Sequence, residues 1–124
     1  MTMAEGSWAA LTQELDAWEQ AGLMADFWWR DDDATRPGPL LDQLLESAAG
    51  LPLHLAVIPQ DATRELADLL RADHGQVLVL PHGWAHRNNA PTGEKKAEFG
   101  NHRPLAAMLS EISRGWQELQ ELFG

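Results

Sequence analysis

The chain has 124 residues, 44% of them hydrophobic and 23% charged, which fits one globular domain with a single core. It has 9 Lys and Arg residues against 19 Asp and Glu residues, so its formal net charge is −10. This acidic balance argues against binding to nucleic acid or anionic lipid, which relies on clustered basic side chains. The chain contains no cysteine, which excludes disulfides and thiolate metal ligands.

Signals for export or membrane insertion are not found in the sequence. The first residues lack the basic region and the apolar run of a signal peptide. The longest near-continuous apolar stretch, residues 51–59, is too short to span a bilayer. We therefore expect a cytoplasmic protein that interacts with neither membranes nor nucleic acid.

The first part of the chain predicts two helices with a short strand between them. A helix is expected over residues 7–21, where apolar residues recur at helical spacing. Its apolar face carries Trp8, Leu11, Leu15 and Trp18. The aromatic run at residues 27–29 predicts a strand, which the polar run at residues 30–33 follows directly. A second helix is expected over residues 39–49, because a proline stands at its start and a glycine follows its end.

The rest of the chain predicts two buried strands and further helices. Residues 53–58 and 77–80 are apolar at nearly every position, as in strands that are covered on both faces. A helix is expected between them over residues 61–74, with Asp at its start and Gly after its end. A short helix is expected over residues 94–99 and a long amphipathic helix over residues 104–123. The apolar face of this last helix carries Leu105, Met108, Leu109, Ile112, Trp116, Leu119 and Phe123.

The alternation of strands and helices is typical of βαβ units on a parallel sheet, so we expect an α/β fold. Three strands are too few for a closed barrel, which usually needs about 250 residues. The sequence shows no linker, so residues 1–124 are expected to form a single domain. In the alternation of strands and helices, another strand would normally follow the last predicted helix. We therefore expect the chain to correspond to one half of a larger α/β fold.

Polar side chains follow two of the predicted strands, where parallel α/β folds place their functional sites. The first strand is followed by Asp31, Asp32 and Asp33, and the third by His82 and His86. Three adjacent carboxylates repel one another, so a cation would stabilise them. One aspartate with two histidines is a ligand set for a catalytic metal, and a neighbouring carboxylate could act as the base.

Simpler interpretations of these residues remain open. An aspartate run after a strand can be a solvated loop or a helix cap, and two histidines four positions apart can be structural or surface residues. His102 precedes a proline in a loop and could face either the site or the solvent. The occurrence of both clusters at strand ends in one short chain favours the metal site.

Two short motifs carry these clusters. Residues 27–34 are Phe-Trp-Trp-Arg-Asp-Asp-Asp-Ala, and residues 82–86 are His-Gly-Trp-Ala-His. They resemble the Thr-Phe-Asp-Asp-Gly and His-(Ser/Thr)-x-x-His motifs of the polysaccharide deacetylases, carbohydrate esterase family 4. The order and separation of the motifs are similar to those in the N-terminal half of that family's (β/α) barrel. The resemblance covers residues 25–87 and implies a single, partial polysaccharide-deacetylase-like domain.

The resemblance also implies roles for individual residues. In that family the first aspartate of the pair is the general base, and the second binds the metal with the two histidines. With Arg30 aligned to the motif's Thr, Asp32 is the implied base and Asp33 the implied ligand. His82 and His86 complete the implied ligand set, which is expected to hold a divalent metal such as Zn²⁺. An alignment shifted by one residue would move both aspartate roles one position towards the N-terminus, onto residues 31 and 32.

The sequence departs from the family pattern at several points. Asp31 stands where the family has an apolar Phe, and Ala34 stands where it has Gly. Gly83 stands where the family has the Ser or Thr that steadies the histidine loop. The family's later motifs, which carry an arginine and the catalytic acid histidine, are absent from this chain. Arg30, Asp31 and His102 are therefore the candidate accessory residues of the site, and whether this chain is itself an enzyme is left open.

Three functions are compatible with these residues. The first is a metal-dependent hydrolase that acts on non-peptide carbon–nitrogen bonds, removing N-acetyl groups from carbohydrate or from another acetylated small molecule. The second is a catalytically incomplete, metal-binding half-domain that forms a homodimer through a sheet edge or the last helix. The third is a phosphatase-like hydrolase with Mg²⁺ on the aspartates, in which the histidines bind no metal.

Overall fold

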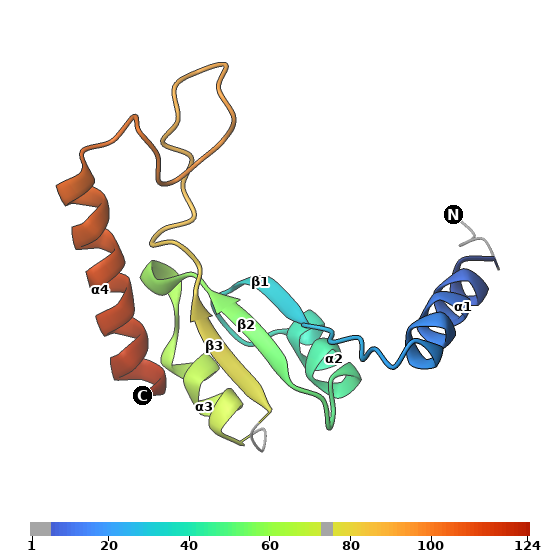
Figure 1. The fold of residues 1–124 in the computed structure, drawn as a ribbon. Coiled ribbons are helices and arrows are strands. Elements are labelled where there is room, and N and C mark those ends of the chain that lie inside the picture. The colour runs from blue at the N-terminus through green and yellow to red at the C-terminus, as the bar shows by residue number, and fades with distance from the viewer. Residues whose placement is uncertain (1–5, 73–75) are drawn as a thin grey trace.

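The computed structural model describes residues 6–72 and 76–124 of the chain (Figure 1). Within these ranges, helices alternate with the strands of one sheet. The helices are α1 (Gly6–Gln20), α2 (Pro39–Ser47), α3 (Arg64–Ala72) and α4 (Leu105–Phe123), and a 3-10 turn, η1, spans Pro59–Asp61. The strands are β1 (Arg30–Ala34), β2 (Leu53–Val57) and β3 (Val77–Pro81).

The strands form a parallel sheet in the order β1-β2-β3, so the predicted α/β class is found. β2 and β3 pair in a regular register that runs from Leu53 opposite Val77 to Val57 opposite Pro81. Because neighbouring strands run in the same direction, the carboxyl ends of β1 and β3 lie at the same edge of the sheet. The loops that leave these two ends can therefore meet above it.

The core lies on the face of the sheet that α3 and α4 cover. Leu55 and Val57 of the central strand pack there against Leu66 of α3 and Leu119 of α4. Helix α4 also approaches η1 closely at Gly115. A Cβ atom added at this glycine would lie 3.1 Å from Pro59 Cγ. This close packing fixes η1 next to the loop that follows β3. None of the helices in the described ranges is long and apolar enough to cross a membrane.

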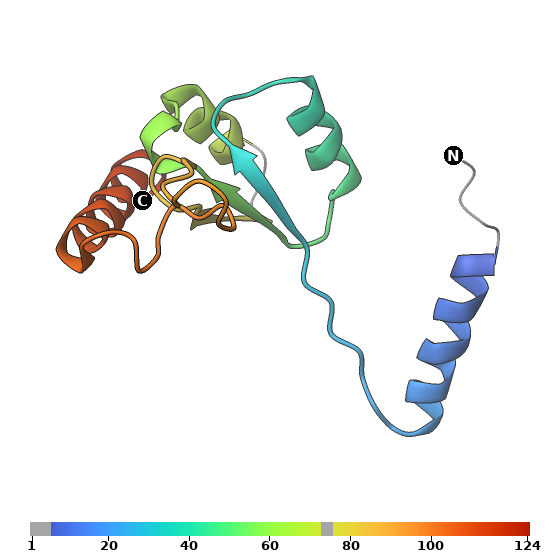
Figure 2. The ribbon, with the colours of Figure 1, turned by 90° about the horizontal axis from the view of Figure 1, so that it is seen from above.

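Helix α1 forms as predicted from residue 6 to residue 20, but its apolar face is not buried. The helix stands apart from the sheet in both views (Figures 1 and 2). Its side chains Trp8, Leu11 and Trp18 are 66%, 40% and 40% exposed. A helix of this length is only marginally stable in water without packing partners. This face is thus available for contact with another surface.

The first strand lies three residues later than the sequence predicts. The aromatic run 27–29 precedes the sheet, and the charged residues Arg30–Asp33 form most of β1 itself. β1 is an edge strand, where charged side chains are tolerated because one side of the strand is open to solvent. Hydrophobicity alone therefore selected the wrong segment. The three aspartates belong to the strand rather than to a loop after it.

Two helix predictions also need correction. Residues 94–99 form an irregular loop instead of a helix, in which the Asn88 side chain accepts hydrogen bonds from the backbone N–H groups of Ala90 and Ala97. Helix α3 begins at Arg64 rather than at residue 61, and Thr63 caps it by accepting a hydrogen bond from Leu66 N. The predicted end of α3 at residues 74 and 75 lies outside the described residues.

Candidate metal centre

Three predicted ligands meet at the carboxyl edge of the sheet. Asp33 is the penultimate residue of β1, His82 follows β3 directly, and His86 lies four residues further along. Asp33 Oδ1 is 3.0 Å from His82 Nε2 and 3.3 Å from His86 Nε2. One ligand atom from each residue lies within 4.8 Å of the other two. The structure thus brings a carboxylate and two imidazole nitrogens to one point.

These separations fit a shared divalent ion. For ligand bonds of about 2.1 Å, neighbouring ligand atoms are about 3.0 Å apart in an octahedral arrangement and about 3.4 Å apart in a tetrahedral one. The distances from Asp33 Oδ1 to His82 Nε2 and His86 Nε2, 3.0 and 3.3 Å, lie within that interval. His82 is half-buried and the other two residues are exposed, so the point is open to water and to a small molecule.

A bulge in β1 helps to aim Asp33 at the histidines. Asp31 pairs with Leu55 and Ala34 with Val57, so β1 holds one more residue than β2 over the same stretch. A bulge changes the alternation of side chains and often redirects one of them next to a functional site. The ladder resumes beyond it, where the Ala34 carbonyl accepts a hydrogen bond from Ile58 N at 3.1 Å.

Two of the three ligands have an unfavourable backbone conformation. Asp33 has φ 72° and His86 has φ 53°, and they are the non-glycine residues with positive φ in the described part of the chain. A left-handed conformation costs a residue other than glycine about 1 kcal/mol or more, and such strain is concentrated at functional sites. Its coincidence with the ligand set is therefore an argument for function that is independent of the distances.

Backbone hydrogen bonds at His82 and at Trp84 hold the loop after β3 against β2 and η1. The His82 backbone N–H donates to the Val57 carbonyl at 2.8 Å, and Gln60 N donates to the Trp84 carbonyl at 3.0 Å. The Trp84 side chain is buried, and the Arg114 guanidinium of α4 lies 4.7 Å from its ring centre. Trp84 therefore holds the loop in place by packing, and the candidate ligands are the histidines on either side of it.

Arg30 and Asp32 form an ion pair next to the ligands. The guanidinium meets both carboxylate oxygens, at 2.8 Å from Nε to Oδ1 and 3.2 Å from Nη2 to Oδ2. Arg30 also lies 5.3 Å from the centre of the Trp28 ring. The pair is exposed and contributes little to stability, but it orients the carboxylate of the residue that directly precedes the ligand Asp33.

Asp31 lines a groove between β1 and α2. The groove has a volume of about 570 Å³. It is lined by side chains of the strand, among them Trp29, Asp31 and Asp32, and by leucines of α2. Asp33 also borders it, so the groove is continuous with the candidate metal centre.

His102 is not part of the cluster. It lies in the turn before α4, and its Nε2 atom is buried without a hydrogen-bond partner in the part of the chain described here. Its ring packs against Gly100, where an added Cβ would lie 2.8 Å from His102 Cε1. The structure therefore does not bring this accessory candidate to the ligands.

The sequence analysis missed Glu98, whose carboxylate holds the histidine loop. Its Oε1 accepts hydrogen bonds from Trp84 N at 3.1 Å and Ala85 N at 2.6 Å, and its Oε2 accepts one from His86 N at 3.2 Å. The donors in these contacts are all backbone N–H groups, which every residue except proline has, so the sequence does not reveal them. The signal that could have pointed to them is the glycine at position 83, which leaves room for the carboxylate.

Comparison with known proteins adds nothing to this description: no family model, curated protein or solved structure matches the chain. The chemistry of the centre therefore follows from the chain's own residues.

Proposed function

We propose that the chain binds Zn²⁺ through Asp33, His82 and His86 and is a metal-dependent hydrolase that removes N-acetyl groups from carbohydrate. The observation that carries this proposal is the convergence of the three ligand atoms of Asp33, His82 and His86; the residue before Asp33 is Asp32, whose carboxylate is paired with Arg30. Two imidazoles and one carboxylate are typical ligands of catalytic zinc, whereas Mg²⁺ prefers oxygen ligands alone. The motif resemblance to polysaccharide deacetylases, with their (β/α) barrel, supports the same reaction.

Each residue has a distinct role in this proposal. A divalent metal supplies a Lewis acid that polarises the acyl carbonyl and favours ionisation of water. Asp32 accepts the proton of the attacking water and returns it to the nitrogen of the leaving amine, since its two oxygens together have lone pairs that the hydrogen bonds to Arg30 do not use. Arg30 orients that carboxylate and keeps it apart from the ligand Asp33.

The groove beside β1 is suited to a neutral sugar. It combines the partly exposed ring of Trp29 with polar side chains such as Thr35 and Gln43 along its length. The aspartates at its rim and the net charge of −10 disfavour an anionic substrate. We therefore assign the carbohydrate part of the substrate to this groove and the acetyl group to its end at Asp33.

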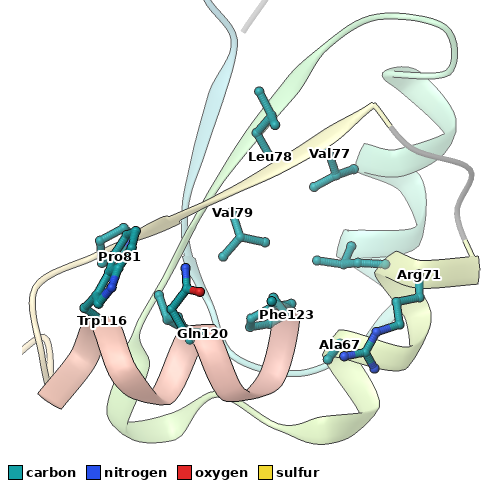
Figure 3. Close-up of a pocket in the computed structure, with 12 residues that line it drawn as sticks. Ala67, Arg71, Val77, Leu78, Val79, Pro81, Trp116, Gln120 and Phe123 are labelled. Carbon is teal, nitrogen blue, oxygen red and sulfur yellow. The ribbon is translucent and has the colours of Figure 1, made fainter.

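The second candidate is a metal-binding domain that pairs with itself and has no turnover. It is favoured by an apolar groove of about 310 Å³ between the free edge of β3 and α4 (Figure 3). In this groove Trp116 is 57% exposed and Leu78 is 55% exposed. Exposed apolar surface at a strand edge is a typical contact between copies of a chain, and cyclic dimers are the commonest assembly.

Acetate release from chitooligosaccharides in the presence of Zn²⁺ tests the proposal. The hydrolase requires release by the wild-type chain and its loss in Asp32→Asn with metal binding retained. Zinc binding without release would instead support the second candidate. If the wild-type chain binds no zinc in calorimetric titration, both candidates are wrong; binding of Mg²⁺ that His82→Ala leaves unchanged would point to the phosphatase-like alternative.

A further inference from the structure

The segment that follows the histidine loop returns to it from the outside. Residues 87–104 leave the carboxyl edge of the sheet and come back before α4 begins (Figures 1 and 2). Glu98 lies on the returning part and is half-buried. Its two carboxylate oxygens accept hydrogen bonds from three successive backbone N–H groups, those of Trp84, Ala85 and His86.

We propose that Glu98 is a positioning residue of the metal centre: its carboxylate holds the loop between the two histidines in the conformation in which both can bind one ion. The inference rests on the proposed metal site and adds a residue that lies outside the ligand set. Three N–H groups that point to one place would lack partners if the loop were left without an acceptor. A carboxylate satisfies them with charge-assisted hydrogen bonds, which are stronger than neutral ones.

Glu98 also accounts for the left-handed backbone of His86. A residue with positive φ persists only where its surroundings determine the conformation. The bond from His86 N to Glu98 Oε2 acts on this residue directly, and the bonds to Trp84 and Ala85 fix the turn before it. The imidazole of His86, in the loop after β3, is thereby directed to Asp33 on β1.

Gly83 is the structural complement of Glu98. It has φ 62°, and a Cβ atom at this position would overlap Glu98 Oε2. A side chain at position 83 and a carboxylate at this place therefore exclude each other. The two residues therefore act together: Gly83 has no side chain, and this leaves room for the Glu98 carboxylate to accept the hydrogen bonds of the loop.

The returning segment is itself fixed, so that Glu98 can act as a rigid support. The Glu98 carbonyl accepts hydrogen bonds from Asn89 Nδ2 at 3.3 Å and Arg103 Nη1 at 3.4 Å. Arg103 also donates two hydrogen bonds, at 2.8 and 2.7 Å, to Glu111 of α4. The guanidinium thus links the segment to the longest helix, whose Gly115 packs against the 3-10 turn and the Gly83 carbonyl.

The test compares Glu98→Gln with Glu94→Gln in calorimetric titrations with Zn²⁺ and in visible spectra with Co²⁺. The control changes the same charge on the same segment, at an exposed residue whose side chain makes none of the hydrogen bonds described above. Loss of a residue that orients a metal ligand typically lowers metal affinity about 10- to 100-fold. We expect such a loss for Glu98→Gln, together with an altered Co²⁺ spectrum, and a change of less than about threefold for the control.

A double-mutant cycle tests the link between Glu98 and Gly83. Gly83→Ala should weaken zinc binding about 10-fold or more in the wild-type background but much less in the Glu98→Ala background, where no carboxylate meets the new Cβ. The cost of the left-handed backbone is common to both backgrounds and cancels. Equal losses in the two backgrounds would contradict the proposed link between the two residues.

The outcomes separate this inference from the proposed function. Wild-type zinc binding that Glu98→Gln leaves unchanged would overturn the role of Glu98 and keep the metal site. If the wild-type chain binds no metal, the site itself is wrong, and the inference falls with it. If Glu98→Gln does not fold, amide exchange in the wild-type protein decides: slow exchange at Trp84, Ala85 and His86 is expected, and rapid exchange at all three would overturn the proposal.

Discussion

Replacement of Asp33 by asparagine should abolish most zinc binding, whereas the same replacement at Asp32 should not. The two substitutions remove the same charge and the same atom type from adjacent exposed residues, so they form a matched pair. Asparagine is preferred to alanine because Asp33 has φ 72°, a conformation that asparagine tolerates. The difference between the variants therefore reports the ligand role alone.

The expected difference in zinc affinity between the two variants follows from the different roles of Asp33 and Asp32. Loss of a group that merely supports a ligand costs about 10- to 100-fold in affinity, so loss of a ligand should cost at least about 100-fold. Asp32 is not a ligand in this assignment, so its charge acts on the ion only through electrostatic attraction. A unit charge several ångströms from a divalent ion contributes, in the dielectric of water, on the order of 1 kcal/mol, which is about 10-fold or less in affinity. Because Arg30 is paired with Asp32, the net effect should be smaller still.

Isothermal titration with Zn²⁺, in competition with a chelator of known affinity, measures both variants and the wild type. The expected order is a loss of at least about 100-fold for Asp33→Asn and less than about 10-fold for Asp32→Asn. Equal losses would shift the ligand assignment by one residue along β1. Wild-type affinity in Asp33→Asn would mean that the carboxylate only hydrogen-bonds to the histidines and that no ion is shared.

Three further predictions concern the fold and its surfaces. Leu66→Ala should lower the free energy of unfolding in urea by about 2–5 kcal/mol because Leu66 is fully buried, whereas Leu40→Ala, at an 82% exposed residue, should change it by less than about 0.5 kcal/mol; equal effects would contradict the described core. Hydrogen bonds from Arg103 lower the pKa of Glu111 below its ordinary 4.5, so the ion pair stabilises the fold above about pH 4.5 and ceases to do so as the pH falls below the lowered pKa. Glu111→Gln should thus destabilise the chain in urea at about pH 7 and by progressively less as the pH falls through the lowered pKa, and a loss that does not decrease at any acidic pH would rule out the ion pair. Sedimentation velocity should show a dimer that Trp116→Ser converts to monomer, and a wild-type monomer at all concentrations would remove the basis for self-association.

The two apolar strands could be located from the sequence by their hydrophobicity, but the expected burial holds for β2 and not for β3, which lies at the edge of the sheet with Leu78 55% exposed. Residues 53–58 and 77–80 are apolar at nearly every position, and the structure has β2 and β3 there. The other edge strand, β1, could not be located in this way. Its backbone pairs with β2 through Arg30 and Asp31, opposite His54 and Leu55, while the more hydrophobic run before it stays outside the sheet.

The meeting of Asp33 with the two histidines could be anticipated because it depends on topology. The carboxyl ends of parallel strands lie at one edge, so residues there come together whatever the details of the loops. The alignment of the aspartates could not be decided from sequence, since three identical residues stand in a row. It is the bulge between Asp31 and Ala34 that places Asp33 beside His82 and His86.

The bulge in β1 and the hydrogen bonds of Glu98 each constrain the backbone of one candidate ligand. Each forces one ligand into a backbone conformation that the chain would not adopt by itself, at Asp33 on the strand and at His86 on the loop. Strain of this kind lowers stability, so it is retained where the constrained geometry is useful. A solvated aspartate run or a pair of surface histidines would need neither device. The presence of both, directed at the same point, is the strongest physical reason to regard this cluster as a metal centre.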